Sequence, residues 1–175
     1  MDTKLTGKTR IESDLIGARE IPAEALYGVQ TLRGIENFSI SKFRLSEYPL
    51  FIKGLAITKM AAAMANFELG LLTVEQKDAI IAACGEILDG KHHDQFPVDM
   101  IQGGAGTTTN MNANEVIANR ALELMGHERG EYQYCSPNDH VNCSQSTNDA
   151  YPTAIHIGMY FKHLQLLPHL EELIA

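Results

Sequence analysis

Three consecutive polar residues near the end of the chain have side chains suited to binding an anion. Ser146, Thr147 and Asn148 are all residue types that cap helices, and an acidic residue and a proline follow them closely. The first N–H groups of a helix have no partner inside the helix, and they lie at the positive end of its dipole. Hydroxyl and amide groups beside them could form a site for a carboxylate. Simple capping of the helix is the alternative.

A glycine-rich segment leads into a second predicted helix start. The stretch Gly104-Ala-Gly-Thr107 lacks the lysine of a nucleoside-triphosphate loop and the third glycine of a dinucleotide-binding turn. What remains is a backbone that can approach a ligand closely, with the Thr107, Thr108 and Thr109 hydroxyls beside a helix N-terminus. A tight turn with a threonine cap would explain this segment alone. Two such helix starts in one chain suggest a small diacid as the ligand.

Two other pairs of reactive side chains are weaker candidates. His140 and Cys143 could form a nucleophile pair, but no pattern in the sequence places their side chains together. Arg19 and Arg33 stand near turn glycines, where a guanidinium can bind a carboxylate in a forked arrangement. Most arginines in such loops pair locally or face water, and we expect the same here.

No metal site is predicted. His92 and His93 are adjacent, so their side chains point apart on any regular element, and we interpret them as loop residues. Cys84, Cys135 and Cys143 are odd in number and lack the close paired spacing of a zinc site or a disulfide framework. We expect all three to be free thiols.

Charge and hydropathy exclude several classes of protein. The 175 residues include 14 basic and 22 acidic side chains, a net charge of −8, and no basic run that could follow a nucleic acid backbone. An anionic substrate would be repelled at long range, so binding must depend on local donors. We expect no apolar run long enough to span a membrane and find no secretory signal, which predicts a cytoplasmic protein.

The elements that position these residues are mostly helices. Residues 1–10 are polar and predict a mobile arm, and residues 11–38 predict short extended pieces and turns rather than long elements. Apolar residues at helical spacing then predict helices over residues 50–69 and 73–90, and a glycine-rich turn running into a third helix lies within residues 102–126. The last helix, from Ser146 onward, stays apolar to its end and needs a partner surface.

Several segments together resemble one known family. They are Gly103-Gly-Ala-Gly-Thr-Thr-Thr-Asn-Met-Asn-Ala-Asn-Glu115, Pro137-Asn-Asp-His-Val-Asn142 and Gln145-Ser-Thr-Asn-Asp-Ala-Tyr-Pro-Thr153. These resemble the aspartase and class II fumarase superfamily, and the resemblance covers nearly the whole chain. Ser-Thr-Asn in place of Ser-Ser-Asn, Gly-Gly-Ala-Gly-Thr and the segment Gly130-Glu-Tyr-Gln-Tyr134 look like the aspartase branch. Class II fumarase is the alternative.

The resemblance implies a fold and a reaction. The fold would be mainly α, with residues 1–141 as the N-terminal domain and residues 142–175 as the start of a central helix bundle, in a homotetramer whose active sites combine three subunits. Aspartate would lose a proton and then ammonia to give fumarate through an aci-carboxylate intermediate. By this resemblance Thr107, Ser146, Thr147 and Asn148 bind the substrate carboxylates. No cofactor is required, and activation by a divalent cation stays open.

This chain also departs from the family pattern. The family's base is a serine on a Gly-Ser-Ser loop beyond residue 175, so no catalytic base is expected here, and we predict a truncated chain that is inactive alone. Cys143 replaces the usual lysine before the Ser-Thr-Asn segment, and Ser136 replaces a histidine of a second anion site in fumarases, so we do not predict that site. A noncatalytic helical assembly module is a further alternative.

Overall fold

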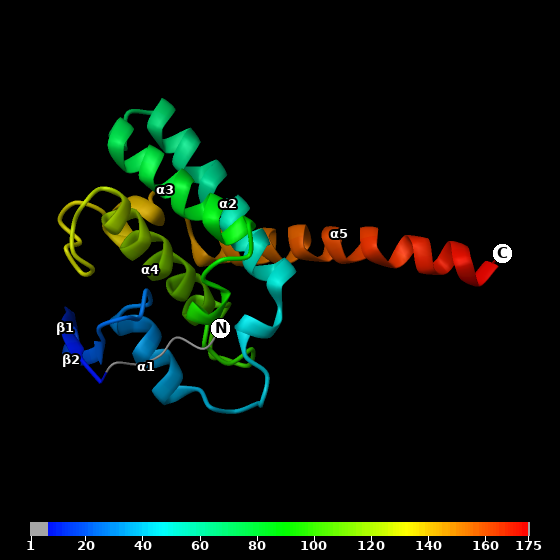
Figure 1. The fold of residues 1–175 in the computed structure, drawn as a ribbon, viewed down its shortest axis with the longest axis horizontal. Coiled ribbons are helices and arrows are strands. Elements are labelled where there is room, and N and C mark those ends of the chain that lie inside the picture. Colours follow the sequence, from blue (N-terminus) through cyan, green and yellow to red (C-terminus); the bar gives the residue numbers. More distant parts are fainter. Residues whose placement is uncertain (1–6, 175) are drawn as a thin grey trace.

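The chain folds into a small helical body from which one long helix projects (Figure 1). The computed structural model describes residues 7–174. The main helices are α1 (Val29–Asn37), α2 (Pro49–Glu68), α3 (Val74–Leu88), α4 (Thr107–Leu124) and α5 (Thr147–Ile174). Short helical turns are η1 (Leu45–Glu47), η2 (His93–Gln95) and η3 (Pro137–Val141), and the strands are β1 (Thr9–Asp14) and β2 (Gly17–Pro22). The predicted mainly α fold is confirmed.

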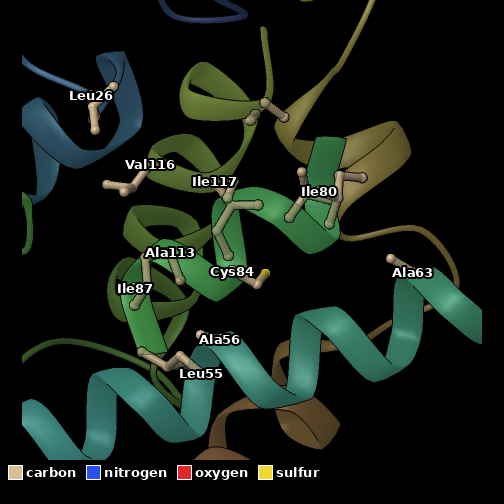
Figure 2. Packing of buried hydrophobic residues seen from close by; sticks show 14 of the residues in the cluster. Leu26, Leu55, Ala56, Ala63, Ile80, Cys84, Ile87, Ala113, Val116 and Ile117 are labelled. Carbon is tan, nitrogen blue, oxygen red and sulfur yellow. The ribbon is translucent and has the colours of Figure 1, made fainter. Parts of the chain in front are cut away.

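The core lies between α2, α3 and α4, and the first turns of α5 pack against α2. Figure 2 shows Leu55 and Ala56 of α2 facing Cys84 and Ile87 of α3, with Ile117 of α4 behind them. All five side chains are buried. Contact of three apolar helix faces removes them from water, which is the main source of stability in a body of this size. Cys84 is thus a core residue in this structure.

Helix α2 corrects one expectation from the sequence. It is long and apolar enough to cross a membrane by length and composition, which contradicts the expectation that the chain has no such run. However, α2 packs along one side against α3 and along another against α5, as in Figure 1. A core helix of a globular protein has the same composition, so this feature is weak support for a membrane span.

The helix start at Thr73 follows local sequence chemistry. The Thr73 hydroxyl oxygen accepts a hydrogen bond from the Gln76 N–H at 3.2 Å, and the Gln76 side-chain oxygen accepts one from the Thr73 N–H at 3.1 Å. This reciprocal pair is the capping box that the spacing predicts.

Replacing Thr73 by alanine removes the acceptor for the Gln76 N–H. We expect the free energy of unfolding to fall by about 1 kcal/mol, because an N–H of the first turn of α3 then loses its protein partner. Urea denaturation followed by circular dichroism measures this change. A midpoint equal to that of the unaltered chain would contradict the role of the cap.

The N-terminal segment is more regular than the sequence indicates. Residues 1–6 of the predicted mobile arm lie outside the described residues, but Thr9 and Arg10 begin β1, so the prediction is wrong there. The Arg10 guanidinium donates to the backbone carbonyls of Pro22, Ala25 and Tyr27 and pairs with Glu12. These contacts fix the start of the hairpin.

The expectation of only short pieces between residues 11 and 38 is also wrong, because α1 is a helix of nine residues. Gly28, which precedes it, has no side chain to cap it. The buried carboxylate of Glu115 in α4 instead accepts hydrogen bonds from the N–H groups of Gly28, Gln30 and Thr31. The cap of α1 is therefore supplied by a residue far along the chain.

Candidate functional site

The N-terminus of α5 lies at the surface with its polar side chains available. Ser146 and Asn148 are exposed and Thr147 is half-buried. The Ser146 hydroxyl oxygen accepts a hydrogen bond from the Asn148 N–H at 3.1 Å, so it caps the helix. Ser144, in the turn before it, has a left-handed backbone with φ of 58°. This turn directs the chain sharply into α5.

The N-terminus of α4 lies against the first turns of α5. A side chain at Gly106 would place its Cβ 2.3 Å from the Tyr151 ring, so only glycine allows this contact. The backbone of Gly106 also has a φ of 87°, a left-handed conformation that favours glycine. The helix starts that contain Thr107 and Thr147 are therefore brought together within one chain.

Of the three threonines that begin α4, the structure leaves only the first exposed. Thr109 is buried, its N–H donates to the Gln102 side-chain oxygen at 2.9 Å, and its hydroxyl accepts from the Gln102 amide. A side chain at Gly34 of α1 would meet the Thr108 methyl group at 2.3 Å, so Thr108 packs on α1. Thr107 alone has an exposed hydroxyl for a ligand.

A hydrogen-bond network of amide side chains connects the two helix starts beneath the surface. Asn110 of α4 donates from its amide nitrogen to the Thr147 hydroxyl oxygen at 3.2 Å and to the Asn142 side-chain oxygen at 3.0 Å. The Asn142 amide nitrogen donates to the Gln145 backbone carbonyl at 3.1 Å. These bonds hold the turn between η3 and α5 in one geometry.

Lys59 of α2 lies at the base of this network and is fully buried. Its ammonium nitrogen is 2.9 Å from the side-chain oxygens of both Asn142 and Gln145. Burial lowers the pKa of Lys59 from its usual 10.5 to about 7, and the Cys84 thiol opposes this shift weakly. The sequence interpretation missed Lys59, although a single lysine inside an otherwise apolar helix is a signal that could have identified it.

The lowered pKa of Lys59 predicts a specific pH dependence of stability. Between about pH 7 and 10.5 the unfolded chain holds a proton on this amine that the folded chain has lost. The free energy of unfolding therefore rises with pH across this window, by at most about 1.4 kcal/mol per pH unit from this group. Urea denaturation at several pH values should show this rise in the unaltered chain relative to Lys59→Met. Parallel curves for the two proteins would contradict it.

The structure does not bring the weaker candidates to this site. Arg33 pairs with Asp14, with its Nε 2.9 Å from the carboxylate, and Arg19 pairs with Glu36. Both arginines are thus engaged locally, as the sequence interpretation expected.

The His140 and Cys143 side chains are not in contact. The His140 Nδ1 accepts a hydrogen bond from the Ser136 N–H at 2.7 Å, and its Nε2 lies 3.2 Å from the Gln76 amide nitrogen. The Cys143 sulfur lies 3.7 Å from the Ser144 hydroxyl oxygen. A nucleophile pair is absent here within residues 7–174. Ser136 is the N-cap of η3, a single π-helical turn, and its hydroxyl oxygen accepts from the Asp139 N–H.

Other sequence predictions have clear outcomes. All three cysteines are free thiols, as predicted, and Cys84 and Cys135 are buried. His92 has a left-handed backbone and its ring contacts the Glu86 carboxylate at 2.7 Å. Among residues 7–174, no three histidine, cysteine or acidic side chains cluster closely enough to hold a metal ion.

Two large cavities among the described residues do not include Thr107 or the residues from Ser146 to Asn148. One of about 660 Å³ lies between the start of α2 and the middle of α5. The other, of about 620 Å³, lies between the β1–β2 hairpin and the Ser136–Asn138 segment. Thr107, Ser146 and Asn148 are exposed in this chain, so further groups would be needed to enclose a ligand there.

Comparisons with known proteins relate the chain to one family of enzymes. The model of the lyase family matches residues 17–175. An aspartate ammonia-lyase from Helicobacter pylori is 64% identical over 151 residues, which are 86% of this chain and 32% of that protein. An aspartate ammonia-lyase from Escherichia coli is 56% identical over 170 residues, 97% of this chain and 36% of that protein. The chain thus spans about a third of the length of these curated relatives.

Solved structures give the same result. A fumarate lyase:delta crystallin from Brucella melitensis has a TM-score of 0.94 and 52% identity, over 96% of this chain and 36% of that chain. A class II fumarase from Schistosoma mansoni has a TM-score of 0.80 and 39% identity, over 86% of this chain and 32% of that chain.

Proposed function

The chain belongs to the lyase family, and from this premise we propose that it forms the N-terminal part of an aspartate ammonia-lyase. The enzyme would convert L-aspartate reversibly to fumarate and ammonia. The observation that carries this proposal is the identity of 64% and 56% with two aspartate ammonia-lyases over most of the chain. The polar groups at the starts of α4 and α5 agree with a carboxylate substrate.

The proposed reaction explains why donors are needed at these helix starts. Removal of a proton next to a carboxylate gives an aci-carboxylate, which carries more negative charge than the substrate. Donors already aimed at that oxygen stabilise the charge as it develops, because they need not reorganise during the reaction. Thr107, Ser146, Thr147 and Asn148 would supply these donors, together with the N–H groups of two helix N-termini.

The chain would not perform the reaction alone. A general base must lie within hydrogen-bond reach of the proton that it removes. Thr107, Ser146, Thr147 and Asn148 carry hydroxyl or amide groups, which are not basic near neutral pH. We propose that the base lies on a part of the enzyme outside this chain. Residues 142–175 would begin the central helix bundle of a cytoplasmic homotetramer, which would bring that part to the site. No cofactor takes part in the proposed reaction.

Two alternatives each rest on one observation. The similarity to a class II fumarase from Schistosoma mansoni favours hydration of fumarate to malate, at lower identity than the aspartate ammonia-lyases. The exposed apolar side chains along the outer half of α5 favour a noncatalytic module that only assembles with other helices, namely Leu164, Leu166, Leu167, Leu170 and Leu173.

The proposal can be tested with a hybrid enzyme, in which this chain replaces the matching third of the Helicobacter pylori relative. We expect the hybrid to release fumarate from aspartate and not from malate, and the chain alone to release it from neither. Ultraviolet absorbance of fumarate measures both reactions. An assembled hybrid that acts only on malate would favour the fumarase alternative. An assembled hybrid that acts on neither would favour the noncatalytic module.

A further inference from the structure

Lys59 is a buried cation whose two hydrogen-bond partners carry no charge. None of the ion pairs found among residues 7–174 involves Lys59, and its ammonium group contacts the side-chain oxygens of Asn142 and Gln145. Burying an unpaired charge costs stability, and a fold that retains such a group often uses it at a functional site. An apolar side chain would fill the same position in α2 without this cost.

The amine of Lys59 determines which atoms of Asn142 and Asn110 act as donors and which as acceptors. Below its pKa of about 7 the Lys59 amine is charged, and in that form it donates and cannot accept, so Asn142 must turn its side-chain oxygen toward Lys59. The same oxygen also faces Asn110, which must therefore present its amide nitrogen. The amide orientation of Asn142 and Asn110, which is otherwise ambiguous by geometry alone, is fixed by the cation.

The amide orientation of Asn110 in turn sets the orientation of the Thr147 hydroxyl at the proposed substrate site. The second hydrogen of the Asn110 amide points to the Thr147 hydroxyl oxygen, 3.2 Å away, so that oxygen accepts. A hydroxyl carries one hydrogen, and with its oxygen engaged below, that hydrogen is free to point outward. An outward O–H at a helix N-terminus can donate to a carboxylate.

We propose that Lys59 is a positioning residue for the substrate carboxylate, which acts through Asn142 and Asn110 to hold the Thr147 hydroxyl as an outward donor. This inference rests on the proposed function, because it assigns the carboxylate of that substrate to Thr147. The cation also adds positive potential beneath the N-terminus of α5. It contacts no substrate itself, so its effect on binding depends on the intervening amides.

The test measures fumarate binding by the hybrid enzyme, in which the proposed site is complete. Fumarate is titrated at about pH 6 into the hybrid with the unaltered chain and into the hybrid with Lys59→Met, and calorimetry gives the dissociation constant of each. We expect fumarate to bind at least about tenfold more weakly to Lys59→Met, which is a loss of about 1.4 kcal/mol. Lys59→Arg, which keeps a donating cation, should restore part of the affinity, whereas a purely structural filling role would not distinguish arginine from methionine in this way.

Lys53→Met is the matched control, since Lys53 lies on the same helix and is only half-buried. It should bind fumarate like the unaltered chain. If Lys59→Met does not fold, Asn110→Asp decides instead, because it keeps Lys59 but places an acceptor below Thr147, so the Thr147 hydroxyl must donate inward. The same weakening is expected for that variant, and unchanged affinity would overturn the proposal.

The outcomes separate this inference from the proposed function. Equal fumarate affinity in the unaltered chain and in a folded Lys59→Met overturns the positioning role and leaves the proposed function intact. A hybrid whose fumarate affinity is unchanged by Thr147→Val overturns the carboxylate site itself, and the positioning role with it.

Discussion

Replacing Thr147 by valine in the hybrid enzyme is expected to lower kcat for fumarate formation about 100- to 1000-fold, the loss typical of one donor to a developing oxyanion. Valine keeps the shape of threonine and removes the hydroxyl. The Asn110 amide then loses an acceptor that lies 3.2 Å away, and the substrate carboxylate loses a donor. The rate of fumarate release from saturating aspartate measures kcat.

Thr153→Val is the matched control for this substitution. Thr153 is an exposed threonine on the same helix, outside its N-terminal turn, so its hydroxyl cannot donate at the helix start. The control should keep nearly the full rate. Equal losses in the two variants, or no loss in Thr147→Val, would show that the hydroxyl at the start of α5 does not bind the reacting carboxylate.

Replacing Gly54 by alanine is expected to lower the free energy of unfolding by about 2 kcal/mol, as overpacking of a close contact does. The added Cβ would lie 2.2 Å from the backbone carbonyl oxygen of Ala154 in α5, a distance that no real contact permits. Helices α2 and α5 must move apart, and because Lys59 of α2 supports the start of α5, the site must change as well. Urea denaturation measures the stability, and fumarate binding measures the site.

Gly85→Ala is the matched control for Gly54→Ala. Gly85 lies inside α3, and no atom lies within 4 Å of a Cβ added there. Alanine should raise the free energy of unfolding by about 0.5 to 1 kcal/mol at this position, because it reduces the freedom of the unfolded chain. If both substitutions shift stability in the same direction and by similar amounts, the close approach of α2 and α5 is not a determinant of the fold.

Features that depend on neighbouring residues could be predicted from the sequence. The capping box of Thr73 and Gln76 is complete within four residues, and the structure contains it. The helix start after Ser146 is likewise local, since Ser146 caps through the Asn148 N–H. The glycine-rich turn before the three threonines also indicated a helix start there, and α4 begins at Thr107. In each case the residues that stabilise the element are the residues that signal it.

Features that depend on distant residues could not be predicted in this way. Helix α1 begins without a cap of its own, because Glu115 from α4 accepts its free N–H groups, and no local pattern reports that contact. The same holds for Arg10, whose hydrogen bonds to Pro22, Ala25 and Tyr27 turn a polar stretch into a strand. The helical spacing around Lys59 indicated a buried helix, but not the amides that accept from its amine.

The most direct test of the proposed carboxylate site is a crystal structure of the hybrid enzyme with fumarate bound. We expect a fumarate carboxylate within hydrogen-bond distance, about 3 Å, of the Thr107 and Thr147 hydroxyls at the starts of α4 and α5. If fumarate is bound in the active site with both carboxylates held by other residues, and neither hydroxyl contacts it, then the starts of α4 and α5 do not form the carboxylate site.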